Sequence, residues 1–241
     1  EADDFLQFVA IATVCDVVDL VDENRIIVKN GLRQLNNTNN LGLNCLIEET
    51  GLNEKEITVY SLGFVIGPCI NASGRLEFAG LALELLFTEN KEEAKALSKK
   101  LNDLNIERQK LTQLGLEEAI NQVADKNMIL DNKVLVVFIP DVHESIAGII
   151  AGRVREKYNL PTIVLTKAHD GAKGSGRSIE EYNMFEELVK CKDLLGKFGG
   201  HPMAAGLSIP TENIDDFRNT INNNCELTDE DVIRKVFIDL H

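Results

Sequence analysis

The sequence predicts an α/β protein built from a helical first part, a long connecting helix, and a second part in which strands and helices alternate. Three observations carry this prediction. A nearly continuous apolar run fills 5–18, residues rich in Ala, Leu, Glu, Lys and Gln fill 76–126, and short β-branched runs separated by helical patterns fill 134–209. With 241 residues, the chain is long enough for two modest domains.

The first part is predicted to be helical at 5–18, 23–35 and 41–50. Three glycines and a proline at 61–75 predict an irregular passage in place of a regular element. Asp16 lies inside the first apolar run, where a buried and unpaired carboxylate is costly and needs a cation, a donor or a metal. From the residues alone, pairing with Arg25 and metal ligation both remain open.

Apolar residues recur at helical spacing through 76–126, which predicts a long amphipathic helix or a helix pair that connects two domains. In the second part, the short β-branched and apolar runs predict strands at 134–139, 161–165 and 205–209. Helices are predicted at 145–158, 184–195 and 211–224. We expect a glycine-rich loop at 171–176 and a Gly-Gly turn at 199–200.

Composition limits the classes of function. A net charge of −14 argues against a globally basic nucleic-acid binder. Residues 141–210, however, hold nine basic and nine acidic residues, against 16 and 30 elsewhere, so this neutral stretch suits a local phosphate site. No apolar run is long enough for a bilayer and no signal peptide opens the chain, so we expect a cytoplasmic protein without membrane contact. Five scattered cysteines without a Cys-x-x-Cys pair predict reduced thiols.

Two segments of the second part carry candidate ligand-binding residues. The segment GSGRS at 174–178 joins small residues, which let a ligand approach the backbone, to a guanidinium and two hydroxyls suited to phosphate oxygens. The segment FGGHPMAAG at 198–206 places His201 after two glycines in a chain with four histidines. A structural loop and a packed histidine remain open as alternatives. The segment HES at 143–145 is interpreted as a helix cap, with Ser145 as the candidate capping residue.

Five ordered blocks resemble the RecJ branch of the DHH phosphoesterase family. They are ATVCDVV at 12–18, GPCINASGRL at 67–76, HE at 143–144 with AGR at 151–153, GSGRS at 174–178 and FGGHPMAAG at 198–206. The resemblance implies a carboxy-terminal part of the DHH catalytic domain at 1–75, a connector helix at 76–126 and a DHH-associated substrate-binding domain at 127–225. It also implies the truncated start of a following domain at 226–241, where 236–241 is expected to be a strand.

The resemblance implies part of a single-strand-specific DNA exonuclease that acts from 5′ to 3′ in repair and recombination, with single-stranded DNA and repair proteins as partners. Asp16 resembles the last aspartate ligand of a two-metal Mn²⁺ or Mg²⁺ centre. The residues that resemble the family's nucleic-acid-binding set are Arg75, Ser175, Arg177, Ser178, Gly199, Gly200 and His201. The family's upstream aspartate motifs and its Asp-His-His triplet are absent from these 241 residues. We therefore expect the chain alone to be inactive.

Two other interpretations stay open. One is an oligonucleotide or cyclic-dinucleotide phosphodiesterase of the DHH family, which shares a Gly-Gly-His block. The other is a non-catalytic binding scaffold on the same fold. The long connector and the GPCINA block at 67–72 favour the RecJ branch over the phosphodiesterase.

Overall fold

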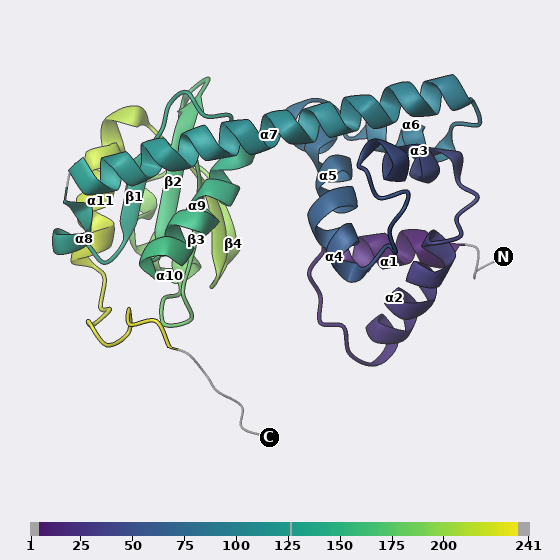
Figure 1. Cartoon of the computed structure of the whole chain (residues 1–241). Coiled ribbons are helices and arrows are strands. Elements are labelled where there is room, and N and C mark those ends of the chain that lie inside the picture. Colours follow the sequence, from purple (N-terminus) through teal and green to yellow (C-terminus); the bar gives the residue numbers. More distant parts are fainter. Residues whose placement is uncertain (1–4, 126, 236–241) are drawn as a thin grey trace. The chain divides into compact units, whose positions relative to one another are not determined.

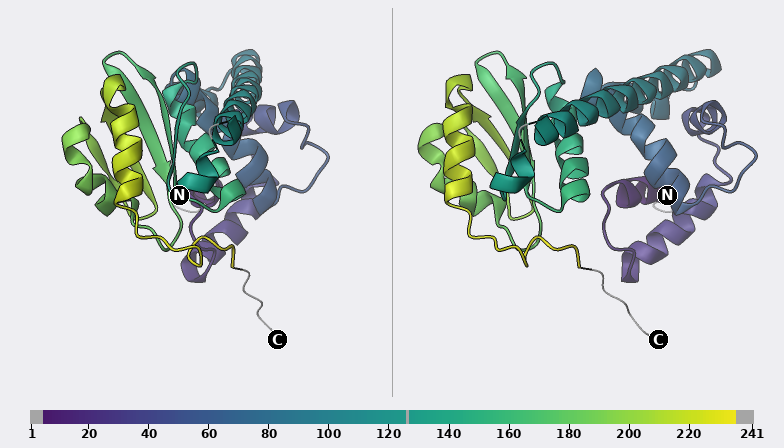
Figure 2. Two further views of the ribbon diagram at one scale, coloured as in Figure 1. Left: turned by 90° about the vertical axis from the view of Figure 1, so that its left-hand side faces the viewer. Right: turned by 60° about the vertical axis from the view of Figure 1, so that its left-hand side comes forward.

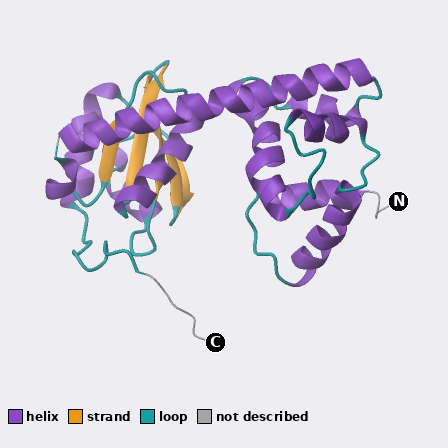
Figure 3. Cartoon of the chain, viewed as in Figure 1, coloured by secondary structure: helices purple, strands orange, loops and turns teal. Residues whose placement is uncertain are grey.

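The computed structural model describes residues 5–125 and 127–235. They form two compact units that meet in sequence at Gln109 and Lys110, and the long helix α7 (Lys91–Asp125) contributes to both (Figure 1). In the described residues, strands occur only in the second unit, so the predicted α/β class is confirmed (Figure 3). The domain boundaries predicted from the sequence, at 1–75, 76–126, 127–225 and 226–241, stay a prediction. The strand expected at 236–241 lies outside the described residues.

The first unit is helical, and its helices confirm the predictions at 23–35 and 41–50. They are α1 (Leu6–Cys15), α2 (Asp22–Leu35), α3 (Leu41–Glu49), α4 (Val59–Ser61), the π-helix η2 (Leu62–Ile66), α5 (Gly67–Leu76), α6 (Gly80–Phe87) and the first part of α7. The first helix ends at Cys15 instead of continuing to 18. Its path changes at Val17, whose φ of 58° lies outside the right-handed helical region.

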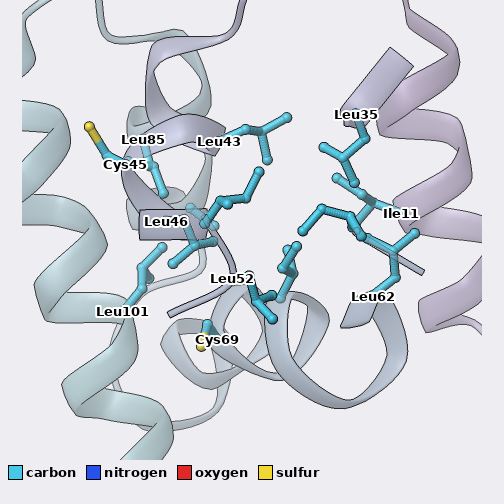
Figure 4. Close-up of a cluster of buried hydrophobic side chains, with 14 of the residues drawn as sticks. Ile11, Leu35, Leu43, Cys45, Leu46, Leu52, Leu62, Cys69, Leu85 and Leu101 are labelled. Carbon is cyan, nitrogen blue, oxygen red and sulfur yellow. The ribbon is translucent and has the colours of Figure 1, made fainter. Parts of the chain in front are cut away.

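A core of leucine side chains holds this unit together. Leu43, Leu46, Leu62 and Leu85 come from three different elements, and each has no exposed surface. Leu101 of α7 joins the same cluster, so the first part of the long helix packs in the first unit (Figure 4). Burying one such side chain contributes about 1.5–3 kcal/mol, which makes this cluster the main source of the unit's stability.

The passage at 61–75, expected to be irregular, is helical, and that prediction is wrong. The elements α4, η2 and α5 follow one another without a break from Val59 to Leu76. Gly67 serves close packing: a Cβ atom there would lie 2.2 Å from Cys15 Sγ. Pro68 occupies the first turn of α5, where a missing N–H is tolerated.

The second unit combines the rest of α7 with a mixed five-stranded sheet in the order β1-β2-β3-β5-β4. Its strands are β1 (Leu135–Phe138), β2 (Thr162–Ala168), β3 (Gly171–Arg177), β4 (Phe198–His201) and β5 (Ala204–Ile209). Its helices are α8 (Met128–Asp131), α9 (Glu144–Tyr158), α10 (Met184–Lys190) and α11 (Ile214–Asn223), with 3-10 turns at Lys192–Leu194 and Thr211–Asn213. The first two strands are parallel and the other pairs are antiparallel.

Helices cover both faces of this sheet (Figure 2). One face carries the main core, in which Ile163, Leu165 and Leu207 of the strands pack with Leu188 of α10 and Phe217 of α11. On the other face, α9 packs against β2 and β3. The predicted strands at 134–139, 161–165 and 205–209 and the helix at 145–158 are confirmed.

The glycine-rich loop expected at 171–176 and the Gly-Gly turn expected at 199–200 are both strands, so these two predictions are wrong. The first is β3, which pairs along its whole length with β2. Gly174 and Gly176 let neighbouring side chains pack closely on the core face of β3. A Cβ atom on Gly174 would lie 2.5 Å from Leu165 Cδ2, and one on Gly176 would lie 3.1 Å from Met184 Sδ. The predicted helix at 184–195 is α10 followed by a 3-10 turn.

The segment after α11 returns along the second unit. Asn159 Nδ2 donates to the Val232 carbonyl at 2.8 Å, and Lys235 pairs with Glu181 at 2.6 Å. Lys133 also pairs with Asp229. These contacts attach residues 229–235 to the unit. No helix in the described parts of the chain is long and apolar enough to cross a membrane.

Candidate nucleic-acid interface

Arg177 and His201 lie in one row across the sheet. Arg177 of β3 is paired with Ala204 of β5, and Ala204 is paired with His201 of β4. Directly paired residues project to the same face, and neighbouring strands lie about 4.8 Å apart. The structure therefore brings together two residues that are distant in sequence, on one face and about 10 Å apart across the sheet.

A second row on the same face ends in two glycines, which form a floor without side chains across β5 and β4. Ser175 is paired with Gly206, and Gly206 with Gly199. A Cβ atom on Gly199 would meet no heavy atom within 4 Å, and one on Gly206 would meet only the Gly174 carbonyl at 3.9 Å. Since α9 packs on β2 and β3, the β5–β4 part of this face is exposed. An extended ligand can approach the backbone there.

The guanidinium of Arg177 is held between β3 and α9. Its Nη1 donates to Ser175 Oγ at 3.0 Å and to the Gly176 carbonyl at 2.7 Å. A Cβ atom on Gly148 of α9 would lie 2.7 Å from Arg177 Nη2 and 2.9 Å from Ser175 Oγ. The missing side chain of Gly148 thus makes the space in which Arg177 and Ser175 lie.

Sequence reasoning missed Gly148. The signal that could have found it is the spacing of Gly148 and Gly152 on one face of a helix, which allows close approach of a neighbouring element.

Ser178 differs from its neighbours in GSGRS. The residue is 1% exposed, and its hydroxyl donates to the Tyr182 carbonyl at 2.6 Å. Its backbone N–H donates to the Met203 carbonyl at 2.9 Å, which ties the end of β3 to the β4–β5 loop. This geometry favours a supporting role for Ser178, with Ser175 and Arg177 as the residues that face the open floor.

The β4–β5 hairpin presents His201 at its tip, where the side chain is exposed. Gly200 precedes it with a φ of +156°, and a Cβ atom there would lie 2.4 Å from the Ala204 carbonyl oxygen. The second glycine of the motif is therefore required by the pairing of β4 with β5, whereas Gly199 leaves open space. The two adjacent glycines have different roles.

The cap of α9 differs from the sequence-based interpretation. His143, not Ser145, is the N-cap residue, and its Nδ1 accepts from the Ser145 N–H at 3.3 Å. Glu144 then pairs with Lys173 of β3 at 2.8 Å. This ion pair lies between two exposed side chains and is worth at most about 1 kcal/mol, but it links α9 to the strand that carries Arg177.

Asp16 is exposed, which corrects the expectation of a buried carboxylate in an apolar helix. It is the C-cap residue of α1, and the neighbouring valines 17 and 18 are exposed as well. Asp16 and Arg25, which both belong to the described residues, form no ion pair with each other. Asp16 and Asn71 of α5 line one hollow of about 610 Å³.

Oxygen ligands of this kind suit Mn²⁺ and Mg²⁺. Asp16 therefore fits a role as one metal ligand. Within residues 5–125 and 127–235, however, no group of three or more His, Cys, Asp or Glu side chains could hold a metal ion. The described residues do not make a complete two-metal centre.

Arg75 stands apart from the other predicted binding residues. It lies in the last turn of α5 and is exposed on the first unit, whereas the glycine floor belongs to the second unit. Its part in nucleic-acid binding stays a prediction.

The second unit matches the model of a known domain family. The DHHA1 domain model matches residues 131–227, which include all five strands, α9 and both segments of the open face.

Relatives of the whole chain are more specific. It is 40% identical over 242 residues to the single-stranded-DNA-specific exonuclease RecJ of Bacillus subtilis (strain 168), which covers 99% of this chain and 30% of that protein. The structure of RecJ from Thermus thermophilus in complex with Mn²⁺ matches with a TM-score of 0.82 and 31% identity, over 92% of this chain and 32% of that one. Its Mg²⁺ complex matches with a TM-score of 0.79 and 30% identity, over 92% and 34%. Over nearly its whole length the chain is similar to RecJ-type proteins, and it spans about a third of the length of these relatives.

Proposed function

We propose that this chain is the substrate-holding part of a single-strand-specific DNA exonuclease, and that the open face of its second unit binds the sugar-phosphate backbone of single-stranded DNA. The observation that carries the proposal is the row of Arg177 and His201 beside a floor of glycines. A guanidinium fixed by two hydrogen bonds is suited to phosphate oxygens, and the floor lets a strand lie close to the sheet.

In this proposal, Ser175, Arg177 and His201 contact the strand, Gly199 provides the surface under it, and Gly200 allows the pairing of β4 with β5. Ser178 supports the end of β3, and Arg75 is a further contact from the first unit. The similarity to RecJ proteins supports single-stranded DNA as the substrate and favours this function over a phosphodiesterase of short oligonucleotides.

The parent activity that we propose is 5′ to 3′ hydrolysis in DNA repair and recombination, with Mn²⁺ or Mg²⁺ as cofactor. Bound metal ions would activate water and stabilise the leaving oxygen. The support is the binding of Mn²⁺ and Mg²⁺ by the related RecJ structures. Asp16 is the ligand that this chain would contribute, and contacts with repair proteins belong to the same proposal.

The test is the affinity of the 241-residue chain for a fluorescent oligothymidylate, measured by anisotropy at low salt. We expect Arg177→Ala and His201→Ala each to weaken binding about tenfold or more, because a hydrogen bond to a charged group is worth about 1.5–3 kcal/mol. Arg177→Lys is expected to recover only part of the loss, since Lys lacks the planar fork.

The matched control is His169→Ala. His169 is exposed, lies in the turn between β2 and β3, and pairs with the equally exposed Asp170 beside it. It should bind like the unchanged chain. Equal affinity of Arg177→Ala, His201→Ala and His169→Ala would rule out the proposed face.

A further inference from the structure

Two aromatic rings are stacked and exposed on the first unit. Tyr60 of α4 and Phe64 of η2 have ring centroids 4.7 Å apart and an interplanar angle of 24°. They are 67% and 68% exposed. Exposed aromatic faces are the surfaces on which nucleic-acid bases stack without regard to sequence.

A hollow of about 780 Å³ lies beside Tyr60. Two of its lining residues are cations, Lys29 and Arg33 of α2, and one is an anion, Glu56. The local balance is positive in a chain whose net charge is −14. Exposed cations beside an exposed ring are the combination that binds a phosphate and its base together.

The walls of this hollow are fixed by hydrogen bonds. Asn36 at the end of α2 donates through Nδ2 to the Ile57 carbonyl at 2.9 Å and accepts through Oδ1 from the Ile57 N–H at 2.8 Å. Thr58 and Ser61 then form a capping box that starts α4. The two walls are therefore held in place before any ligand arrives, which lowers the entropic cost of binding.

We propose that this aromatic and basic hollow is a second contact site for single-stranded nucleic acid. A base stacks on Tyr60, with Phe64 supporting the ring, and the adjoining phosphates pair with Lys29 and Arg33. The inference rests on the proposed function, because it adds a contact for the same substrate on the other unit. The volume lies in the range of about 300–1,000 Å³ usual for ligand sites.

Tyr60 and Phe64 also line an apolar hollow of about 510 Å³, together with Val17, Val18 and other residues. That hollow alone would suit a protein segment. The two cations on the Tyr60 side favour a polyanion, since a purely apolar partner would leave them without a role.

The experiment uses the 241-residue chain and fluorescent oligothymidylate. We expect Tyr60→Ala to weaken binding about tenfold, as loss of one base stack does. Tyr60→Trp should retain the affinity, because indole also offers a stacking face. The double variant Lys29→Ala with Arg33→Ala should weaken binding. It should also reduce the slope of log affinity against log salt concentration by the amount that corresponds to about one to two phosphate contacts.

Matched controls come from the same unit. Phe78→Ala removes an aromatic ring that is also 67% exposed but does not line the hollow. Lys95→Ala removes an exposed cation of α7. Both should bind like the unchanged chain, and circular dichroism should show all variants folded, because Tyr60, Lys29 and Arg33 are exposed.

The outcomes separate this inference from the proposed function. If Tyr60→Ala and the double cation variant bind normally while Arg177→Ala is impaired, the second site is wrong and the sheet face stands. If Tyr60→Ala is impaired and Arg177→Ala is not, the second site stands and the sheet face is wrong. A third outcome concerns self-association of the chain at high concentration. If the unchanged chain self-associates, and Tyr60→Ala loses this self-association but binds DNA normally, the surface is a protein contact and the inference is overturned.

Discussion

Gly148 shows how one residue without a side chain can shape the candidate interface. The guanidinium of Arg177 and the hydroxyl of Ser175 fill the space that a Cβ atom at Gly148 would occupy. Gly152, one turn further along α9, is different, because its Cβ atom would lie 4.0 Å from Arg177 Cγ. Gly148 is therefore the position to test, and Gly152, on the same face of the same helix, is its matched control.

We predict that Gly148→Ala weakens binding of single-stranded DNA about tenfold, because the methyl group displaces the guanidinium from its hydrogen bonds. The fold should tolerate the change, since the displaced group is the flexible end of a side chain. Gly152→Ala should bind normally and raise the free energy of unfolding by about 0.5–1 kcal/mol, as Ala does in helices. Anisotropy and urea unfolding measure both quantities, and normal binding by Gly148→Ala would contradict the positioning role.

Cys69 makes the stability of the first unit depend on pH in the alkaline range. The thiol is fully buried, and burial raises its pKa to about 11 from an ordinary value of 9.0, against an opposing hydrogen bond from Asn105. A folded-state pKa above the unfolded value means that the stabilisation is complete below pH 9 and is lost as the pH rises through about 11. Burial raises the pKa of Cys191 in the second unit to about 11 in the same way.

We predict that the free energy of unfolding falls between pH 9 and 11, by up to about 1.4 kcal/mol per pH unit for each thiol. The double variant Cys69→Ala with Cys191→Ala should be less stable at about pH 7.5, where both thiols are neutral and packed, but show a shallower decline. Urea midpoints at several pH values test this. An equally steep decline in the double variant would show that these thiols are not its cause.

At the scale of elements, the β4–β5 hairpin carries the exposed part of the candidate interface. Its strand β4 consists of Phe198–His201, and it is the edge strand of the sheet. The pairing of β4 with β5 sets His201 in the row of Arg177. Loss of this pairing should therefore impair both the local fold and the binding of nucleic acid.

The two glycines of β4 separate these effects. We predict that Gly200→Ala destabilises the second unit by about 1–3 kcal/mol, because its Cβ atom would meet the Ala204 carbonyl in a strained backbone region. Gly199→Ala should leave the stability unchanged, since its Cβ atom meets nothing, and should weaken DNA binding by raising the floor. Thermal unfolding and anisotropy give the two readings, and a stable Gly200→Ala that binds normally would disprove the assignment.

These glycines also show what the sequence could and could not predict. Amphipathic helices such as α2 and the apolar strands are visible in local patterns, and they were predicted correctly. Glycine has two opposite uses, as a flexible turn residue and as a residue for close packing. Gly67 against Cys15, and Gly174 against Leu165, are of the second kind. Only the distant partner decides which use applies, so the irregular passage and the glycine-rich loop were predicted wrongly.

The candidate site shows the same division. The local residue chemistry indicates Arg177 and His201 as candidates and the family blocks support them, but their common row depends on the order of β3, β5 and β4, which local spacing does not reveal. Asp16 was expected to be buried because its neighbours are apolar. The helix ends before it, so the carboxylate and the following valines are exposed.

At the scale of the whole molecule, the net charge of −14 opposes binding of a polyanion. Binding then depends on local groups, and the proposed contacts use few cations: Arg177 on the sheet, and Lys29, Arg33 and Arg75 on the first unit. The chain is accordingly expected to bind single strands with a modest salt dependence, of about 0.7 in log–log slope for each phosphate contact. A steep slope would indicate many more phosphate contacts than these.

The metal requirement of binding and of hydrolysis should be separable in this chain. We predict that the 241 residues bind single-stranded DNA equally well with EDTA or with Mn²⁺ at constant ionic strength, and do not shorten a 5′-labelled strand with either. The physical reason is that the described residues, 5–125 and 127–235, contain no group of three metal-ligating side chains, while the proposed contacts with DNA are made by side chains of the chain itself.

Asp16→Asn is the diagnostic variant for this prediction. Asp16 is exposed beside Asn71 and distant in sequence from the glycine floor, so its neutralisation should leave DNA binding unchanged. Denaturing gels of the labelled strand, with and without Mn²⁺, measure hydrolysis directly. Cleavage that requires Mn²⁺ and disappears in Asp16→Asn would show that the chain carries a working metal centre. It would contradict the proposal that hydrolysis needs the remainder of a RecJ-type enzyme.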